Sequence, residues 1–567
     1  MVQRYNSTFE PCVRVYALGG LDESGKNMFA IETPDSIFLI EAGSKYPDLS
    51  DPGIDIIIPD FSFIEQHKEK VKAIIISHGH DDVYGALPYL LRTLGNNIPI
   101  YVTKTTEIII RSDFGSRAKN FNFHIIKPSD DILISGYPFH FFETTHSVME
   151  SFGFSVETEA GSIVYTGNYI SDFGSQGHFT FDLAKIAKIA DEHQTLLMLS
   201  ESSGAEKPGI VSPTHKLTSH IKSLIEEGDN RVIVACYLQN LYAINEIIKL
   251  AIANRKKICI TNPKLLEMLP QFMANGDLVI PRANQCTIEE IPMVPQKDLI
   301  ILITGNGEEL FNSIIDLCHG ENKHTALLHI EKDDVFVLAA PPAPSLEILA
   351  TSAEDCLYKT DCKVISLKRK EFTSMHAQQE DIKMLVSIFS PKYFMPVSGD
   401  FRYMMANAKL AESLGYSPNN IFLLDNGMAI NFDRAGNAIT PVVQLFKPTS
   451  IFIDGLGVGD VKSNILEERT TMSTSGAVVL AGCYSSLQKS AVGEPSIELR
   501  GFVAPREEEG LTKQIKLIFK QFLDRIANDL TKKDELSKKF IDTIQQEMKK
   551  QTGKSPLVSI NLIDLDS

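Results

Sequence analysis

The stretch VKAIIISHGHDDV (residues 71–83) carries the most informative pattern in the chain. It begins with an apolar, β-branched run, which predicts a buried strand. The run ends in a polar cluster with two histidines at i and i+2, His78 and His80, and with Asp82 two residues later. Two imidazoles at this spacing can point at one metal ion, and the aspartate can hold a second. The HxH pattern alone is weak, and a polar loop is the alternative interpretation.

The neighbouring segments repeat the pattern of a strand that ends in polar residues. Three apolar runs precede it: VRVYALGG (13–20), MFAIETP (28–34) and SIFLIEAG (36–43). Two follow it, FHFFETTHS and SIVYTGNYIS, and they bring His146 and Asn168 to strand ends. We expect a helix from Ala86 to Leu94. Because α/β and αββα sandwiches place their chemistry at strand ends, these residues are candidates for one site.

The pattern of predicted secondary structure changes at about Ser212. Helix and strand patterns then alternate in HKLTSHIKSLIEEG, RVIVACYLQN, Leu241–Arg255, KKICIT and DLIILITGNGEE. This alternation predicts a separate domain built on a parallel sheet. The first pattern returns near Cys362 with KVISLKRKEFTSMH and YFMPVSGD, so one domain is inserted into another.

The C-terminal part has its own pattern. The sequence REEEG (506–510) suggests an acidic hinge, and apolar residues at helical spacing follow it in two runs. An alternating strand, VSINLI, closes the segment. By pattern alone, this is a small α/β packing domain.

Length and composition exclude several classes of protein. The chain has 567 residues, 43 % hydrophobic and 22 % charged, which is typical of a folded multidomain protein and not of a disordered or coiled-coil one. No run approaches the length of a membrane span, and the N-terminus lacks the apolar core of a secretory signal. Eight cysteines without CxxC pairs are typical of reduced thiols in a cytoplasmic protein. The net charge of −17 disfavours non-specific coating of nucleic acid but permits a local RNA channel.

The polar motifs together resemble those of a known family. SHGHDDV resembles the HxHxDH signature of the metallo-β-lactamase superfamily. ALGGLDESGKNMFAIE (17–32) and GIDIIIPDFSFI (53–64) are similar to the opening of the ribonuclease J family. The likeness continues in the same order over nearly the whole chain, through SESSGAEKPG, TGNGEE (304–309), TSMHAQQE (373–380), PVSGDFR (396–402) and DGLGVGDV (454–461).

This resemblance implies a fold and an activity. The fold is α/β: a metallo-β-lactamase αββα sandwich with an inserted β-CASP parallel α/β domain and a small C-terminal α/β domain. We place the first part of the sandwich at residues 1–211, the β-CASP domain at 212–361, the second part at 362–450, a linker region at 451–510 and a C-terminal dimerisation domain at 511–567. The implied substrate is RNA, cut by 5′-to-3′ exonuclease and some endonuclease activity.

The resemblance also implies two zinc ions, and the ligand positions match only in part. In the family, the first zinc binds the HxH histidines, the third-motif histidine and a bridging aspartate. The second binds the aspartate and histidine that close the signature, the bridging aspartate and a distant histidine. Four positions match and three are substituted: the matching ones are His78, His80, Asp82 and His146, and the substituted ones are Val83, Asn168 and Ser398.

The substitutions weaken the second metal position. Val83 has no donor atom, Asn168 is a neutral donor that cannot bridge two dications as a carboxylate does, and Ser398 offers a poor zinc ligand. Only Asp82 remains there at full strength, so a two-metal mechanism is not expected. Three imidazoles remain for one zinc at most. The alternative is that the histidines are held by packing and bind no metal.

Further residues correspond to substrate contacts in the family. His376 lines up with a catalytic histidine that assists proton transfer to the leaving group, and Ser374 with a serine that contacts phosphate. Gln239 and Asn240 correspond to a second substrate contact, and a helix N-cap in a polar turn is the alternative interpretation. The family's glycines on either side of the catalytic histidine are Met375 and Ala377 here, which can narrow the slot for phosphate.

Three functional hypotheses follow. The first is a weakly active or inactive paralogue that pairs with an active ribonuclease J subunit or with itself, as in the degenerate second paralogue of the family. The second is a working ribonuclease with a single zinc. The third is a metallo-β-lactamase-fold hydrolase of another substrate, against which the β-CASP-like insert and TSMHAQQE argue. No membrane partner is expected.

Overall fold

The computed structural model describes residues 11–47, 51–321, 328–455, 457–459 and 463–566. Part of the DGLGVGDV segment and the first ten residues of the chain, where no secretory signal is predicted, lie outside this range. The chain divides into two compact units. One comprises the N-terminal part up to Tyr46 together with Ile57–Ile451, and the other comprises Pro47–Ile56 and the residues from Phe452 onward.

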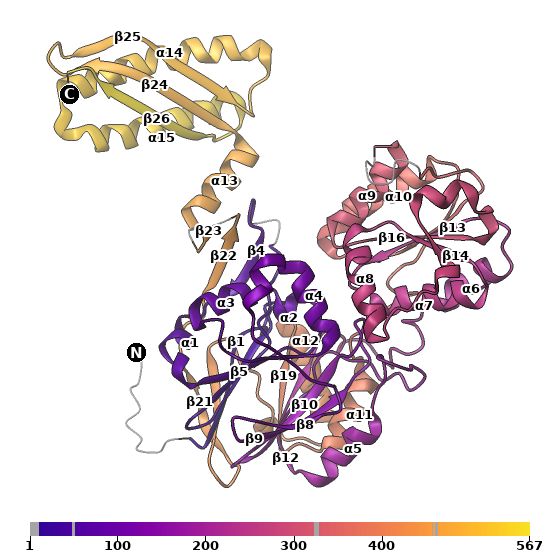
Figure 1. The fold of residues 1–567 in the computed structure, drawn as a ribbon. Coiled ribbons are helices and arrows are strands. Elements are labelled where there is room, and N and C mark those ends of the chain that lie inside the picture. The colour runs from indigo at the N-terminus through magenta and orange to yellow at the C-terminus, as the bar shows by residue number, and fades with distance from the viewer. Residues whose placement is uncertain (1–10, 48–50, 322–327, 456, 460–462, 567) are drawn as a thin grey trace. The chain divides into compact units, whose positions relative to one another are not determined.

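The first unit contains two sheets that face each other (Figure 1). The eight-stranded sheet has the order β21 (Ala438–Gln444), β20 (Met428–Phe432), β1 (Val13–Gly19), β2 (Met28–Glu32), β3 (Ile37–Ile40), β5 (Val71–Ile75), β6 (Ile100–Val102), β7 (Phe123–Ile125). The six-stranded sheet has the order β19 (Tyr393–Val397), β12 (Thr195–Glu201), β11 (Gly161–Tyr165), β10 (Phe152–Thr158), β9 (Tyr137–Glu143), β8 (Asp131–Ile134).

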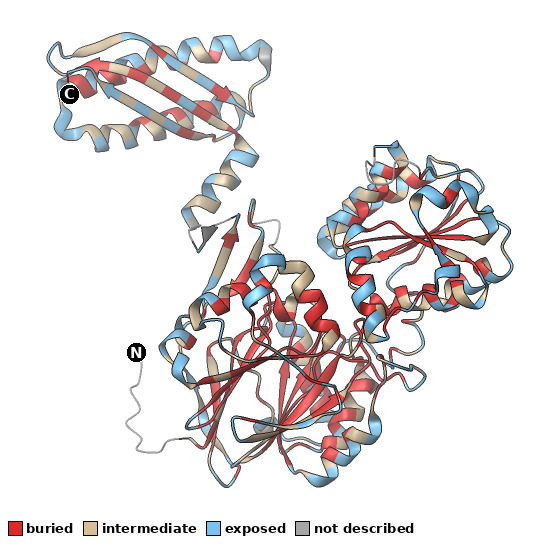
Figure 2. Ribbon diagram, in the orientation of Figure 1, coloured by how far each residue is buried: buried red, intermediate tan, exposed pale blue. Residues whose placement is uncertain are grey.

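Apolar side chains of both sheets fill the space between them. Phe29 and Phe38 of the larger sheet are buried against Phe139, Phe141 and other residues of the smaller one. The outer face of the smaller sheet is covered by α5 (Leu183–Glu192), α11 (Gln379–Phe389) and α12 (Phe401–Ser413). Figure 2 shows the buried residues concentrated along these strands. The result is the expected αββα sandwich.

Short helices follow the strands of the larger sheet. They are α1 (Ser62–Gln66), α2 (Asp81–Tyr84), α3 (Leu87–Leu94) and α4 (Lys104–Phe114). The predicted helix from Ala86 is therefore present as α3. Helix α2 begins directly after the HxH pattern, and α1 begins shortly after β4 (Ile56–Pro59). A side chain at Gly43 would lie 1.7 Å from the Asp82 carbonyl oxygen, so glycine lets the end of the β3 segment pack closely against α2.

The inserted domain is an entirely parallel sheet, as the alternating pattern predicts. Its order is β15 (Gln285–Cys286), β14 (Lys257–Ile260), β16 (Leu299–Gly305), β13 (Val232–Tyr237), β17 (Val335–Ala339), β18 (Lys363–Ser366). The helices that alternate with these strands are α6 (Thr218–Glu226), α7 (Leu241–Ala253), α8 (Pro263–Asn275), α9 (Glu308–His319) and α10 (Glu347–Tyr358). Strand β18 still pairs with β17, so the inserted sheet extends a few residues beyond the proposed limit at residue 361.

The second unit contains β22 (Ser450–Asp454), β23 (Gly457–Val458) and α13 (Ser463–Ser475), followed by a three-stranded sheet. Its order is β25 (Ser490–Arg500), β24 (Ala477–Ser485), β26 (Leu557–Asp564), and α14 (Pro505–Asn528) and α15 (Lys533–Thr552) pack against it. Here the structure differs from the linker expected at 451–510. Strands β24 and β25 form most of the sheet because their inward residues, such as Val478 and Leu480, share a core with Phe519.

One further expectation about this unit changes. The predicted hinge at 506–510 lies in the first turns of α14, where acidic side chains interact favourably with the positive end of the helix dipole. Ile515 and Phe522 of the same helix are buried in the unit's own core.

Among the described residues, no helix is long and apolar enough to cross a membrane. All eight cysteines are unpaired, in agreement with the expected reduced thiols.

Candidate metal centre

Three histidines meet where strands of the two sheets end. His78 and His80 follow β5, and His146 follows β9. His78 Nε2 lies 3.2 Å from His80 Nδ1, and His146 Nε2 lies 3.3 Å from the same atom. The three ring centroids lie 4.7 to 4.9 Å apart. The structure therefore brings together the three imidazoles that the sequence pattern singled out.

The outer nitrogens of these rings are held by neighbours. His146 Nδ1 donates to the Met375 carbonyl oxygen at 2.7 Å, and His80 Nε2 donates to the Gln239 carbonyl oxygen at 3.2 Å. His78 Nδ1 lies 2.8 Å from the Ser77 hydroxyl. Because a carbonyl oxygen only accepts, the inner nitrogens of neutral His80 and His146 carry lone pairs, which face each other without a proton between them.

A cation between the rings resolves this arrangement. Lone pairs held at this separation repel each other, whereas an ion between the rings would accept them, and metal-binding histidines commonly donate their other nitrogen to a backbone carbonyl, as His80 and His146 do. Burial, reinforced by the neighbouring rings, holds the pKa of His78 and His146 well below the usual range. Burial also lowers the pKa of His80 to about 4, so all three are neutral ligands at pH 7. Three neutral imidazoles are a donor set that fits a zinc ion.

Asp82 lies in α2 but stands apart from the three-histidine cluster. Its Oδ2 accepts a hydrogen bond from Asn27 Nδ2 at 3.0 Å, and its backbone carbonyl accepts from the Asn27 backbone amide. Burial and the Asp81 charge raise the pKa of Asp82 to about 7. Within the described residues, the ligand atoms that gather here are those of the three histidines.

The three substituted positions add no strong ligand. Val83 is buried in α2, and its carbonyl oxygen accepts from the Ala42 amide. Asn168 is buried just after β11. Ser398 follows β19 with a φ of 56°, and its backbone bonds to Gly20 and Ser202. None of the three carries a negative charge that could offset a second dication.

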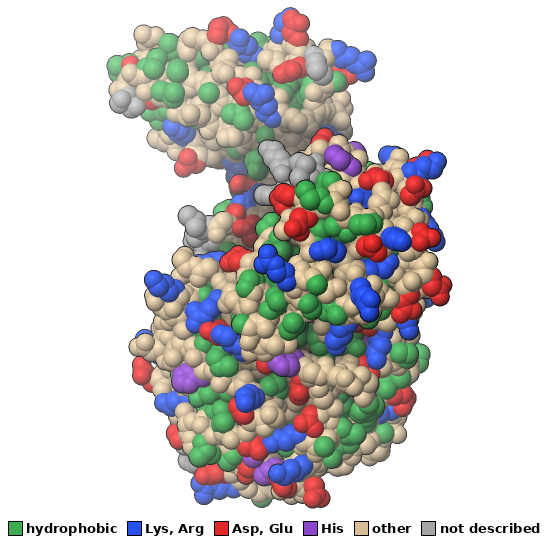
Figure 3. Space-filling view, turned by 45° about the vertical axis from the view of Figure 1, so that its right-hand side comes forward, with side chains coloured by type: hydrophobic (Ala, Val, Ile, Leu, Met, Phe, Trp, Pro, Cys, Tyr) green, Lys and Arg blue, Asp and Glu red, His purple; other side chains and the backbone are tan. Residues whose placement is uncertain are grey.

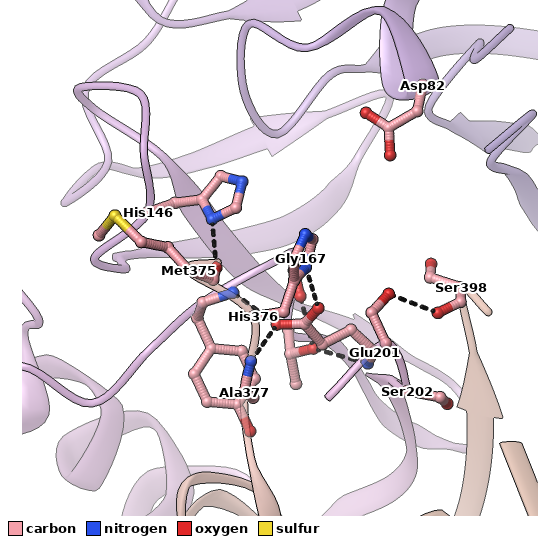
Figure 4. A network of polar contacts seen from close by, with 12 residues as sticks. Asp82, His146, Gly167, Glu201, Ser202, Met375, His376, Ala377 and Ser398 are labelled. Carbon is pink, nitrogen blue, oxygen red and sulfur yellow. Dashed lines mark hydrogen bonds and ion pairs between the residues drawn. The ribbon is translucent and has the colours of Figure 1, made fainter. Parts of the chain in front are cut away.

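His376 is fixed by a residue that the sequence analysis did not identify. Its Nδ1 donates to Glu201 Oε2 at 2.8 Å, and the other carboxylate oxygen accepts from the amides of Ala377 and Tyr169. Figure 4 shows this pair between His146 and Asp82. Burial opposes protonation of His376, but the Glu201 charge outweighs it and raises the pKa of His376. The sequence feature that could have identified Glu201 is its position as an acidic residue at the end of the buried strand β12.

The loop that carries His376 passes close to another backbone. Met375 and Ala377, which replace glycines of the family pattern, are buried. A side chain at Gly204 would lie 2.3 Å from the Ala377 carbonyl oxygen, so this glycine makes room for the loop. Ser374 is exposed at the start of the loop, where a substrate can reach it.

Gln239 and Asn240 come from the inserted domain. Besides the contact to His80, the Gln239 side chain donates from Nε2 to Asp81 Oδ1 at 3.2 Å. Asn240 caps α7, accepting from the Ala243 amide at 3.0 Å. The N-cap interpretation therefore describes Asn240, and the cap presents Gln239 to the metal centre.

A second buried carboxylate supports the site and was also missed. Glu41, with a φ of 63°, accepts from the Ser77 amide at 3.1 Å, directly before His78. Burial raises the pKa of Glu41 to about 8. The glutamate lies at the end of β3, beside the histidine loop, where the sequence alone gives no partner for it.

Four family models match the chain. They are described as "Beta-lactamase superfamily domain" (residues 49–173), "Ribonuclease J, beta-CASP domain" (229–352), "Zn-dependent metallo-hydrolase RNA specificity domain" (364–424) and "Ribonuclease J C-terminal domain" (464–565). Together they cover the sandwich, the insert and the C-terminal unit, and they imply a metal cofactor.

Curated relatives match over almost the full chain. Ribonuclease J2 of Bacillus subtilis is 30 % identical over 550 residues, which covers 96 % of this chain and 97 % of that protein. Ribonuclease J 2 of Staphylococcus aureus is 29 % identical over 549 residues with the same coverage. A solved structure of a protein of unknown function from Enterococcus faecalis is 16 % identical with a TM-score of 0.51, and it covers 74 % of this chain and all of that one. This last likeness concerns the fold alone.

The Glu201–His376 pair yields a testable prediction. In Glu201→Gln the pKa of His376 should fall, because the charge that favours its imidazolium form is lost while burial remains. Ring resonances followed by NMR across a pH titration measure the change. His178, whose pKa the Asp277 carboxylate raises to about 8, should titrate as before and serves as the internal control. An unchanged His376 titration would show that Glu201 does not set its charge.

Proposed function

The chain belongs to the ribonuclease J family, and we propose that it is a subunit that binds RNA, holds at most one zinc ion, hydrolyses RNA weakly or not at all, and assembles with an active ribonuclease J or with itself. The observation that carries this proposal is the asymmetry of the metal centre. Three neutral imidazoles converge on one point, whereas Val83, Asn168 and Ser398 supply no charged ligand that could act together with Asp82.

The loss of a second ion has a direct catalytic consequence. In two-metal sites the ions stabilise both the attacking and the leaving oxygen of the phosphodiester, and a single ion stabilises less of the developing charge. When bound to three imidazoles, a zinc ion supplies an activated water. Each ~1.4 kcal/mol of lost transition-state stabilisation lowers the rate tenfold.

The remaining residues have assigned roles in this proposal. His376, held as a proton donor by Glu201, delivers a proton to the leaving oxygen. Exposed Ser374 contacts a phosphate of the RNA, and Gln239 and Asn240 contact the substrate from the inserted domain. The net charge of −17 and the mixture of basic and acidic side chains in Figure 3 favour a local RNA channel over a broad basic surface.

The second candidate function, an active ribonuclease with one zinc, is favoured by a specific observation. The His376–Glu201 pair keeps a partly exposed imidazole, whose pKa the Glu201 carboxylate raises, beside the three histidines. A hydrolase of a different substrate has less support, because the RNA specificity model covers the loop of His376. We also propose a cytoplasmic location, supported by the eight unpaired cysteines.

We propose that assembly occurs through the second unit, by the open face of its three-stranded sheet. One face of the sheet packs on α14 and α15, and the other face carries Val479 and Ile563, 42 % and 47 % exposed. Val479 and Cys483 are four residues apart in β24, so their side chains lie on the same face of the sheet. Ile563 pairs with Cys483 and therefore lies on that face too. The apolar residues of α14 and β26 expected to include a partner contact are Ile515, Phe519, Phe522, Leu557, Val558 and Ile560, most of them facing inward; Leu557 and Ile560 are half-buried and the other four are buried, so the open sheet face offers the larger apolar surface to a partner.

The metal proposal predicts a stoichiometry. After dialysis against a weak chelator, elemental analysis should find at most one zinc per chain, and that zinc should be lost in His78→Ala and in His146→Ala because they remove a ligand. His376→Ala should keep the zinc, since its ring bonds to Glu201 instead. Two zinc ions per chain that both depend on His78 would contradict the proposal.

Activity should return when the second set of ligands is rebuilt. The triple variant Val83→His, Asn168→Asp, Ser398→His should cut 5′-monophosphorylated RNA at least tenfold faster than the parent, whereas each single change should do little because the ligands act as a unit. Exonuclease assays on one labelled RNA give the rates. The triple variant with His376→Ala added should remain slow. A parent rate that equals an intact homologue's and does not respond to His78→Ala refutes the proposal.

The open sheet face predicts an effect on assembly. Val479→Lys combined with Ile563→Lys should dissociate the oligomer, because two charges would have to be buried in the contact. Light scattering on the full chain measures the mass. Leu517→Lys, 64 % exposed in α14, is the matched control and should leave the mass unchanged. If the double variant keeps the parental mass, this face does not form the contact.

A further inference from the structure

A second cluster of potential ligands joins the sandwich to the inserted domain, away from the three histidines. Glu150 lies in the loop between β9 and β10, His178 lies in the loop after β11, and Asp277 follows α8 of the insert. His178 Nδ1 lies 2.7 Å from Asp277 Oδ1 and 3.5 Å from Glu150 Oε1. One atom of each residue thus faces a common point, and the three atoms lie within 4.8 Å of one another.

A single threonine holds both carboxylates in place. The Thr105 amide donates to Glu150 Oε2 at 2.9 Å, and the Thr105 hydroxyl donates to Asp277 Oδ2 at 3.2 Å. Asn275 Nδ2 also donates to Asp277 Oδ2. Each carboxylate therefore has one oxygen fixed by a donor, and its other oxygen is directed at His178. This is the pattern in which outer partners orient metal ligands.

The atom at the centre of the cluster lacks a hydrogen bond. His178 Nδ1 is buried, and although Asp277 Oδ1 is close, the pair does not have hydrogen-bond alignment. The Asp277 and Glu150 side chains are only 1 % and 13 % exposed, so two negative charges converge here in a region of low solvation. The adjacent Asp277 carboxylate, to which Glu150 adds, raises the pKa of His178 to about 8, so the cluster favours a positive charge at this point. A proton on Nδ1 can supply that charge, but Nδ1 and Asp277 Oδ1 are not aligned for a hydrogen bond, and the three ligand atoms leave a place for a metal ion instead.

We propose that Glu150, His178 and Asp277 bind a divalent first-row transition-metal ion that ties the sandwich to the inserted domain. Ligand atoms 2.7 and 3.5 Å apart can both lie ~2.1 Å from one ion. Imidazole with two carboxylates suits Mn²⁺ or Zn²⁺ better than Mg²⁺, which prefers oxygen ligands alone. The His178 side chain is 38 % exposed, which gives the ion a path from solvent and room for water ligands.

A second group of potential ligands in the sandwich differs from this cluster in its hydrogen bonds. His140, Glu157 and His193 also lie close together. Both ring nitrogens of His140 have a carboxylate partner at 2.8 Å, one in Asp131 and the other in Glu157. His178 Nδ1, in contrast, has no aligned hydrogen-bond partner. The Glu150–His178–Asp277 cluster also connects two domains.

The experiment counts Mn²⁺ sites on the full-length protein by electron paramagnetic resonance of free and bound Mn²⁺. His178→Gln and Asp277→Asn should each bind one Mn²⁺ fewer than the parent. His124→Gln, which removes an exposed imidazole in contact with the Tyr101 ring, should bind the parental number. Counting the difference between proteins separates this site from the three histidines, so the result does not depend on the proposed function.

A second readout protects the test against a variant that folds poorly. Mn²⁺ should raise the thermal unfolding midpoint of the parent and of His124→Gln more than that of His178→Gln, because an ion that binds only the folded state stabilises it. His178→Gln alters a partly exposed side chain and keeps both carboxylates, so it is the decisive variant if Asp277→Asn fails to fold. Equal Mn²⁺ counts and equal midpoint shifts in the parent and in His178→Gln would overturn the proposal.

Discussion

The unprotonated inner nitrogens of buried imidazoles are the constraint on which the functional centre depends. His80 and His146 each donate the N–H of the outer ring nitrogen to a backbone carbonyl, that of Gln239 and that of Met375 respectively. Both carbonyls are far from the histidines in sequence. Those carbonyls come from the inserted domain and from the loop before α11. The metal centre thus requires both sheets of the sandwich and the insert to be folded together. A cation placed there stabilises the join between domains as well as the chemistry.

Electrostatics explains why one metal position is retained in the proposal and the other is not. The first position needs only neutral ligands, which burial favours, and burial lowers the pKa of each of its histidines. The second position needs carboxylate charge to offset a dication in a buried place. Asp82 alone supplies that charge, and burial already raises its pKa to about 7. A subunit of this kind can keep its fold and its RNA-facing loops while its catalytic charge balance is lost.

Polar contacts also join the sandwich to the inserted domain at two places. Near the centre, Gln239 reaches both His80 and Asp81, and the Tyr242 amide donates to the Ser147 carbonyl. Farther along, Glu150, His178 and Asp277 gather around Thr105. Both contacts connect the loop that follows His146 to the insert. An ion bound at either place would therefore stabilise the contact between the sandwich and the inserted domain.

The periodicity of the sequence by itself determined the element types and the inserted parallel sheet, because strands such as β5 and β13 are buried, apolar and bounded by polar turns. It also determined the ligand candidates, since HxH is local and metal chemistry restricts the residue types. It did not reveal Glu201 or Glu41, because each acts through a partner many residues away. It assigned β24 and β25 to a linker, since a sheet with one open face has an irregular apolar pattern. Tertiary structure alone decided that Asn240 is a cap, that Glu201 raises the pKa of His376, and that Thr105 holds two carboxylates toward one histidine, because these contacts depend on distances between segments that sequence spacing does not encode.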